Sequence, residues 1–375
     1  MSRLPTFDPG FSTEELARIY SPDGTVGAIL EFEAALALAL ADAGIAPLAE
    51  AERVASACAG GVEDSQSILT STWEAGTPIL ALRAAILARV EDEMASRWFH
   101  FGATTQDAVD TAQMLQAGSA LDYLVDGLAS IASRLRELTV AHRERAHEGR
   151  TFLQEARPTT FGFRTATWLH AVLGHFEDLR ALRKGLIIQL GGPVGTLAEY
   201  GEDASAVVEA LARRLGLASP GISWHGDREP IRALANSVSR TAGTMAKIGS
   251  DIALLASTGI GEIKVRSGGS SSMPGKENPV DSFRAVAASA ACSGAVAMLS
   301  SAPPIELDRG VGGWHVEWLA LPLVFQTTGA AVEAIDISVR TLEPAGPATE
   351  ADAAVIAGSS AQIDSVLAKA GRILG

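Results

Sequence analysis

Proline is missing from three long stretches of this chain, and these gaps constrain the fold more than any other feature. None occurs between Pro78 and Pro158, between Pro230 and Pro274, or between Pro322 and Pro344. A proline inside a helix removes a backbone hydrogen bond and clashes with the preceding turn. The sequence therefore predicts long, uninterrupted helices in these segments.

Apolar side chains recur along the first two gaps with the spacing of a helix seam. In the first gap two rows repeat every seven residues: Met114, Leu121, Leu128, Leu135 and Ala117, Leu124, Ile131, Leu138. In the second gap spacings of four and three alternate: Leu234, Val238, Thr241, Met245, Ile248, Ile252, Leu255. Alternation of apolar and polar residues with β-branched enrichment is not evident anywhere. We predict an all-α fold, a bundle of long helices.

Length and composition refine this prediction. A chain of 375 residues is long enough for two or three domains, and its residues are 47% apolar but only 5% aromatic, which suits closely packed helices. We expect an N-terminal helical domain over 1–103, a central bundle over 104–342 and a tail over 343–375 with one short helix at 361–374. The Ala/Ser-rich run 285–302 is expected to be a buried helix in tight contact with its neighbours, not a membrane span.

Charge and cysteine content exclude several functions. The net charge of −14 argues against nucleic acid and anionic membranes as partners, so an anionic substrate must meet a local basic pocket. Cys58 and Cys292 provide neither a disulfide framework nor a zinc site. The N-terminus has no signal-peptide stretch. We expect a cytoplasmic protein without a metal or other cofactor.

The segment 268–279, Gly-Gly-Ser-Ser-Ser-Met-Pro-Gly-Lys-Glu-Asn-Pro, combines features of an anion site. Its glycines let hydroxyl and N–H groups approach a small ligand, and Lys276 adds a positive charge. Asn278 and Pro279 are typical of an N-cap and a first helical position. A Gly/Ser linker that ends in a capped helix is the alternative interpretation.

The order of residues in this segment resembles the signature loop of the fumarase/aspartase superfamily, G-S-S-x-M-P-x-K-x-N-P. Segment 100–107, His-Phe-Gly-Ala-Thr-Thr-Gln-Asp, is similar to its first conserved region, and 149–162 is similar to the second. The loop 190–197 also looks family-like and is expected to be structural. The resemblance implies that the tail 343–375 replaces most of a third domain found in larger members.

The resemblance also implies roles for individual residues. Ser270 matches the catalytic base, assisted by Lys276 and loop N–H groups. Thr104 and Thr105 match a pair that binds a substrate carboxylate. They precede a long helix whose N-terminus favours an anion, although an ordinary helix cap would look the same. The remaining substrate-binding candidates are Gln154, Ser271, Asn278, Arg309 and His225.

The family implies a homotetramer in which three chains build each site around a small polycarboxylate substrate. The three motif loops near residues 104, 154 and 270 are separated by long helices. Loops at opposite ends of such helices cannot meet within one chain.

A further set of residues resembles the branch that interconverts 3-carboxy-cis,cis-muconate and its lactone in aromatic catabolism. The set comprises Trp224-His225, Arg228, Gly312-Gly313-Trp314 and Glu317-Trp318. The resemblance implies a cycloisomerase. A lyase that expels another acidic leaving group, such as nitrite from nitrosuccinate, and a structural homologue without catalysis remain alternatives.

The chain departs from the family at its general acid. Phe152 stands where many superfamily lyases carry His, and Glu155 stands where some cycloisomerases do. His100 and His225 match the family, and either of them could be structural. His142 and His147 are expected to be solvated at the end of a long helix. A carboxylate leaving group needs no strong acid, whereas hydroxide and amines do. The missing His therefore favours the cycloisomerase.

Overall fold

Five long helices form the centre of the structure, which is a computed structural model that describes residues 8–90, 92–310, 312–346 and 348–375. The bundle consists of α7 (Thr105–Ala141), α8 (Phe161–Lys184), α10 (Glu229–Leu255), α11 (Val280–Ser301) and α12 (Gly313–Arg340). Every residue of the two predicted seams is buried, in α7 and in α10. The prediction of an all-α fold built on long helices is confirmed.

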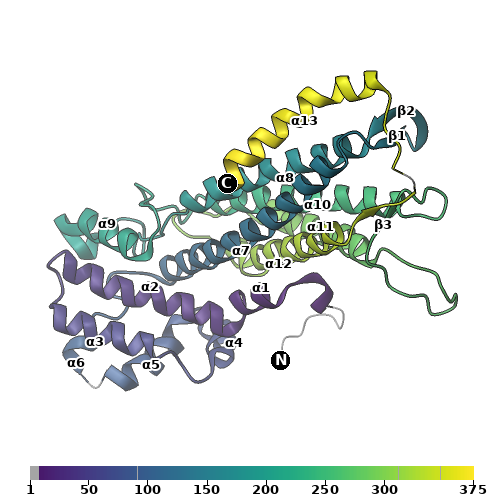
Figure 1. The fold of residues 1–375 in the computed structure, drawn as a ribbon. Coiled ribbons are helices and arrows are strands. Elements are labelled where there is room, and N and C mark those ends of the chain that lie inside the picture. Colours follow the sequence, from purple (N-terminus) through teal and green to yellow (C-terminus); the bar gives the residue numbers. More distant parts are fainter. Residues whose placement is uncertain (1–7, 91, 311, 347) are drawn as a thin grey trace.

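A second apolar core lies beside one end of the bundle (Figure 1). Its N-terminal elements are α2 (Pro22–Asp42), α3 (Leu48–Ala59), α4 (Ser65–Ala75), α5 (Ile79–Val90) and α6 (Glu93–Ser96). The two elements that precede them, η1 (Asp8–Phe11) and α1 (Glu14–Ile19), pack on the bundle instead. Segments from beyond residue 103 join the second core as well. They are the first turns of α7, residues 188–190, η2 (Ala198–Asp203), α9 (Ala204–Leu215), which packs on α2, and Trp314 of α12.

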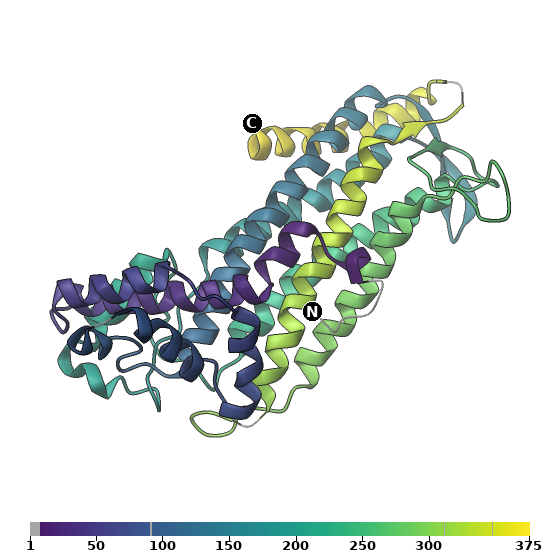
Figure 2. The ribbon, with the colours of Figure 1, turned by 90° about the horizontal axis from the view of Figure 1, so that it is seen from below.

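Two small antiparallel sheets depart from the predicted absence of strands. One pairs β1 (Ala146–Thr151) with β2 (Gln154–Thr160), and the other pairs β3 (Ile263–Lys264) with β4 (Glu343–Pro344). The last helix, α13 (Ala353–Leu374), begins earlier than predicted and packs on α8. Both views place the β1–β2 hairpin and the loop 265–279 at one end of the bundle, far from the N-terminal helices (Figures 1 and 2).

Helix α11 is less buried than predicted. By length and composition α2, α11 and α12 could each cross a membrane, but the apolar stretches of α2 and α12 are 61% and 67% buried within the chain, whereas that of α11 is 39% buried. One face of α11 packs in the bundle through Ala285, Ala288 and Cys292, and the opposite face exposes Phe283 and Val286. The predicted tight contact with neighbours is confirmed, since α11 packs on α10 and α12, but the predicted burial extends over only one face of the helix within this chain.

Candidate active site

The start of α7 is held by one buried carboxylate. Asp107, which is 0% exposed, accepts a hydrogen bond from the backbone N–H of Thr104 at 2.9 Å and closes the first turn of the helix. The N–H groups of Gly191 and Gly192 donate to the same carboxylate, each at 2.9 Å. The loop 190–197 therefore has the structural role expected of it, because it fixes the segment that carries Thr104 and Thr105.

Hydroxyl groups and a guanidinium meet at this helix N-terminus. The hydroxyls of Thr105 and Thr77 lie 2.6 Å apart, and the guanidinium of Arg309 donates to the hydroxyl of Thr104. Helix N–H groups, hydroxyls and a cation together suit a carboxylate. Thr77 was missed in the sequence, where a Thr before Pro78 carries no signal of its own.

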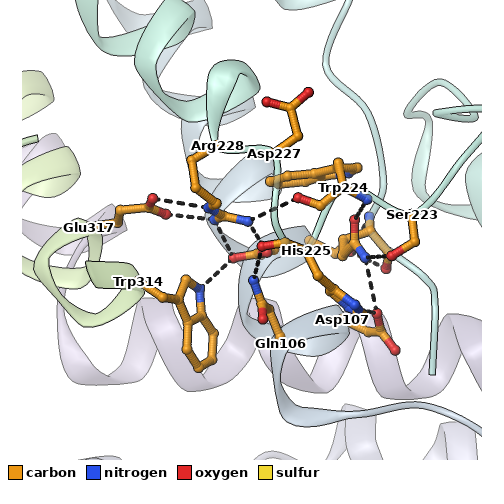
Figure 3. Close-up of polar contacts among 12 residues, drawn as sticks. Gln106, Asp107, Ser223, Trp224, His225, Asp227, Arg228, Trp314 and Glu317 are labelled. Atoms are coloured by element: carbon orange, nitrogen blue, oxygen red, sulfur yellow. Dashed lines mark hydrogen bonds and ion pairs between the residues drawn. The ribbon is translucent and has the colours of Figure 1, made fainter. Parts of the chain in front are cut away.

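His225 is buried, at 3% exposed, and supports the group of residues around Thr104 and Thr105. Its Nε2 lies 2.7 Å from Oδ1 of Asp107, and its carbonyl accepts a hydrogen bond from the side chain of Gln106 at 3.0 Å. Figure 3 shows His225 directed toward Asp107. These contacts favour a positioning role for His225 over the substrate contact that the family resemblance suggested.

A buried cation connects three distant segments beneath the same helix (Figure 3). The guanidinium of Arg228 bonds both oxygens of Asp110, at 2.7 and 2.9 Å, and both oxygens of Glu317, at 3.0 and 2.6 Å. It also lies over the ring of Trp224, and Trp314 donates to Asp110 at 2.8 Å. Burial alone would lower the pKa of Arg228, but Asp110 and Glu317 raise it above its ordinary value. The residues that resemble the cycloisomerase branch therefore form one cluster.

Arg228→Met should lower the free energy of unfolding by about 3–5 kcal/mol, because it leaves two buried carboxylates without their cation. The matched control is Arg240→Met, whose partner Asp178 is exposed, and it should cost about 1 kcal/mol or less. Urea unfolding of both variants measures the difference. Equal, small losses would show that the buried cluster adds nothing to stability.

His100 also lies at this end, paired with a buried carboxylate. Its Nδ1 is 2.6 Å from Oε1 of Glu33. Burial acts to lower the pKa of His100, but the charge of Glu33 and this hydrogen bond outweigh burial and raise the pKa above 6.5. A raised pKa in the folded state adds stability that is complete below the unfolded-state pKa and is lost as pH rises through the folded-state value.

Glu33→Gln should therefore flatten the decline of stability with pH. From about pH 6 to about pH 9 the urea midpoint of the wild type should fall more than that of the variant, because only the wild type loses an ion pair as His100 deprotonates. Parallel declines in the two proteins would contradict the raised pKa.

The Ser270 loop lies at the other end of the bundle. Its two ends are joined by hydrogen bonds between Gly268 and Asn278 at 2.8 and 2.9 Å. The hydroxyl oxygen of Ser270 accepts from the backbone N–H of Ser272 at 3.4 Å and of Met273 at 3.1 Å. N–H groups aimed at one oxygen stabilise negative charge on it. Ser271 and Lys276 are exposed on the same loop.

The N-cap of α11 is one residue later in the sequence than predicted. The helix begins at Val280 with Pro279 at the N-cap. The side chain of Asn278 donates to the carbonyl of Gly269 at 3.1 Å, so Asn278 braces the loop in place of capping the helix.

Gln154 sits at the tip of the β1–β2 hairpin, at the same end. The two residues of the turn, Phe152 and Leu153, both have positive φ, at 51° and 62°, a backbone conformation that is uncommon for large side chains. Phe152 is 99% exposed. Gln154 and Glu155 are exposed as well. Sequence reasoning missed this hairpin because β2 exposes both of its faces over most of its length and shows no alternation.

The histidines near this hairpin differ from prediction. His147 is buried in β1, not solvated on a helix. The side chain of Arg164 donates to its Nε2 at 2.7 Å, and burial together with Arg164 lowers the pKa of His147 to about 4. His142 caps the C-terminus of α7, is partly buried and has a pKa that burial lowers. His147 is therefore neutral near pH 7 and is not available there as an imidazolium acid.

The candidate residues thus form two groups at opposite ends of the helix bundle of one chain. Helix α7 has 37 residues, so it spans about 55 Å at the rise of an α-helix. Thr104, Thr105, Arg309 and His225 lie near its start, and the hairpin that carries Gln154 follows its end. The Ser270 loop lies at the hairpin end (Figure 1). Within one chain the two groups cannot meet.

A family model described as lyase matches residues 11–292. The chain belongs to this family. It is 37% identical to the 3-carboxy-cis,cis-muconate cycloisomerase of Pseudomonas aeruginosa over 348 residues, which cover 90% of this chain and 76% of that protein. It is 34% identical to the nitrosuccinate lyase of Streptomyces davaonensis, covering 82% of this chain and 68% of that one.

Solved structures agree with this membership. The crystal structure of 3-carboxy-cis,cis-muconate lactonizing enzyme from Pseudomonas putida superposes with a TM-score of 0.85 at 34% identity, covering 94% of this chain and 78% of that one. The predicted superfamily of lyases, fumarase/aspartase, is therefore confirmed. Within it the chain is most like the cycloisomerases.

Proposed function

We propose that this lyase-family chain is a 3-carboxy-cis,cis-muconate cycloisomerase of aromatic catabolism. The observation that carries the proposal is the hydroxyl oxygen of Ser270, which accepts two backbone N–H bonds. A serine hydroxyl is a poor base unless its anion is stabilised. Two aimed N–H groups and the positive charge of Lys276 on the same loop favour that anion.

In the lactone-opening direction the Ser270 oxygen removes the proton from the carbon next to a carboxylate. The lactone C–O bond breaks, a carbon–carbon double bond forms, and the released oxygen becomes the substrate's own carboxylate. In the reverse direction that carboxylate adds to the double bond and Ser270 returns the proton. Thr104, Thr105, Gln154, Ser271 and Asn278 hold the substrate carboxylates, and Arg309 assists through Thr104.

The leaving group explains why this site works without an imidazole acid. Phe152 and Glu155 occupy the positions where relatives carry His, and the nearby His147 has its pKa lowered to about 4. A carboxylate is stable as an anion near neutral pH, so its departure needs no proton. Hydroxide and amine leaving groups would need one.

The complete site requires more than one chain, and we assign it to a cytoplasmic homotetramer. Its two groups of residues lie at opposite ends of the bundle (Figure 1). The exposed face of α11, with Phe283, Val286 and Ala290, repeats at helical spacing and carries no charge. Such an apolar stripe is typical of a helix that packs against another subunit.

A substrate panel tests the function. Carboxymuconolactone should turn over, with a change in absorbance as the double bond forms, whereas malate, aspartate and argininosuccinate should give little product. Phe152→His should not accelerate the lactone reaction, because protonating a carboxylate leaving group gains little. Release of ammonia or hydration of fumarate at comparable rates would overturn the assignment.

Nitrosuccinate belongs in the same panel, because nitrite is also an acidic leaving group and the nitrosuccinate lyase of Streptomyces davaonensis is 34% identical to this chain. Nitrite release faster than lactone opening would select that second reaction. The proposed base and carboxylate sites would serve it equally well.

A further inference from the structure

The carboxylate of Glu262 joins the β1–β2 hairpin to the bundle, at the end where the Ser270 loop also lies (Figures 1 and 2). Its Oε1 forms an ion pair with Nη2 of Arg150 in β1 at 2.7 Å, and its Oε2 lies 3.2 Å from Nδ1 of His147 in the same strand. The side chains of Arg150 and Glu262 are only 16% and 23% exposed. Water therefore screens this ion pair less than it screens a pair on the open surface.

Glu262 is itself fixed by the backbone of the bundle. Its N–H donates to the carbonyl of Leu255, the last residue of α10, at 2.9 Å, and its carbonyl accepts from the N–H of Ala345 at 2.8 Å. The next residue, Ile263, is buried and pairs with Pro344 between β3 and β4. The carboxylate of Glu262 thus projects from a rigid base, and it is the hairpin whose position depends on the contact.

Arg164 of α8 holds the His147 ring in one orientation. Its Nε donates to Nε2 of His147 at 2.7 Å. An imidazole nitrogen that accepts a hydrogen bond carries no proton, so the proton of the neutral ring is on Nδ1. Nδ1 is the nitrogen that faces Glu262. Both groups of β1 that approach the carboxylate therefore attract it.

A bulge directs Arg150 to this carboxylate. The register of the two strands shifts between Glu148 and Arg150, at Gly149. A side chain at position 149 would place its Cβ 2.3 Å from the carbonyl oxygen of Arg157, so the close approach of the strands requires glycine. Bulges re-aim neighbouring side chains, and here the side chain that follows the bulge is the one that reaches the bundle.

Gln154 points away from the side of the hairpin that Arg150 anchors. Arg150 pairs with Glu155 across the hairpin, and Thr151 pairs with Gln154. Successive residues of a strand point to opposite faces. Gln154 is accordingly exposed, and it lies one pair of residues beyond the anchored one. Fixing Arg150 therefore fixes the place from which Gln154 projects.

We propose that Glu262 is a positioning residue, which through Arg150 sets the place of Gln154 for a substrate carboxylate. The inference rests on the proposed function, in which Gln154 holds such a carboxylate. Glu262 acts through the hairpin and does not itself touch the substrate. Precise placement matters, because a displacement of about 1 Å can cost as much as a hundredfold in rate.

Hydrogen–deuterium exchange on the full-length assembled protein tests the anchoring without turnover. Glu262→Gln keeps the shape of the side chain and removes its charge, and Arg150→Met removes the charge of its partner. In each variant the amides of residues 148–157 should exchange about threefold faster or more, because opening the hairpin no longer breaks an ion pair. The matched control is Glu177→Gln, which loses the ion pair with Lys369 between α8 and α13 and should exchange like the wild type in these residues.

Steady-state kinetics with the lactone test whether the anchoring reaches Gln154. Glu262→Gln should raise KM about tenfold and keep kcat within about threefold of the wild type, because a carboxylate ligand serves substrate and transition state alike. In the double variant with Gln154→Ala, kcat/KM should equal that of Gln154→Ala alone, since no positioned amide remains to be lost. A merely structural role of Glu262 would instead multiply the two single effects.

Two results would overturn the proposal: unchanged exchange of the hairpin in both anchor variants, and independent effects of Glu262 and Gln154 on kcat/KM. Failure of the proposed function looks different. The wild type would then not open the lactone, whereas faster exchange confined to the hairpin would still support the anchoring of the Gln154 strand by Glu262.

Discussion

Ser270→Ala is expected to lower kcat for the lactone by about 10² to 10⁴, the contribution typical of a positioned general base. The KM should change little, because the carboxylate-binding groups are other residues. The Ser270 side chain is only partly buried and makes its hydrogen bonds within its own loop. Unfolding behaviour should therefore remain that of the wild type.

Ser272→Ala is the matched control. Ser272 lies two residues away on the same exposed loop, and its backbone N–H, which donates to Ser270, is retained in the variant. Its kcat should stay within a few-fold of the wild type. Steady-state kinetics of both variants, with thermal unfolding as a check, decide the matter. If Ser270→Ala kept wild-type turnover, Ser270 would not be the base, and the loop could be a linker.

Mixing two inactive variants is expected to restore activity. Thr105→Ala damages one end of each chain and Ser270→Ala the other, and the two ends lie about 55 Å apart along α7. If different chains supply them to one site, randomly mixed tetramers contain intact sites. In an equal mixture about one site in four should be intact, because the chain that supplies residue 105 and the chain that supplies residue 270 must each be of the right kind.

The experiment requires subunit exchange, for example by joint refolding or co-expression. Each variant carried through the same treatment alone is the control and should remain inactive. Recovery near a quarter of wild-type kcat per chain would support shared sites. No recovery from mixed tetramers, or a fully active monomer in light scattering, would mean that the two ends never cooperate.

Patterns that repeat along one helix could be interpreted from the sequence alone. The seams of α7 and α10 are buried as predicted, because helical spacing places residues three and four apart on one face whatever the rest of the chain does. The loop 268–279 was also evident, since its residues act as one contiguous segment. The absence of His at positions 152 and 155 could likewise be recognised directly from the sequence.

Contacts between distant segments were decided only by the tertiary structure. Asp107 bonds both His225 and the loop 190–197. Arg228 bonds Asp110, which is 118 residues away in the sequence, and Glu317, which is 89 residues away. No local pattern encodes which buried charges will meet. For the same reason the sequence did not reveal the surroundings of His147, which are formed by the distant residues Arg164 and Glu262. The same reason explains the separation of the two groups of site residues, which follows from where packing places the ends of long helices.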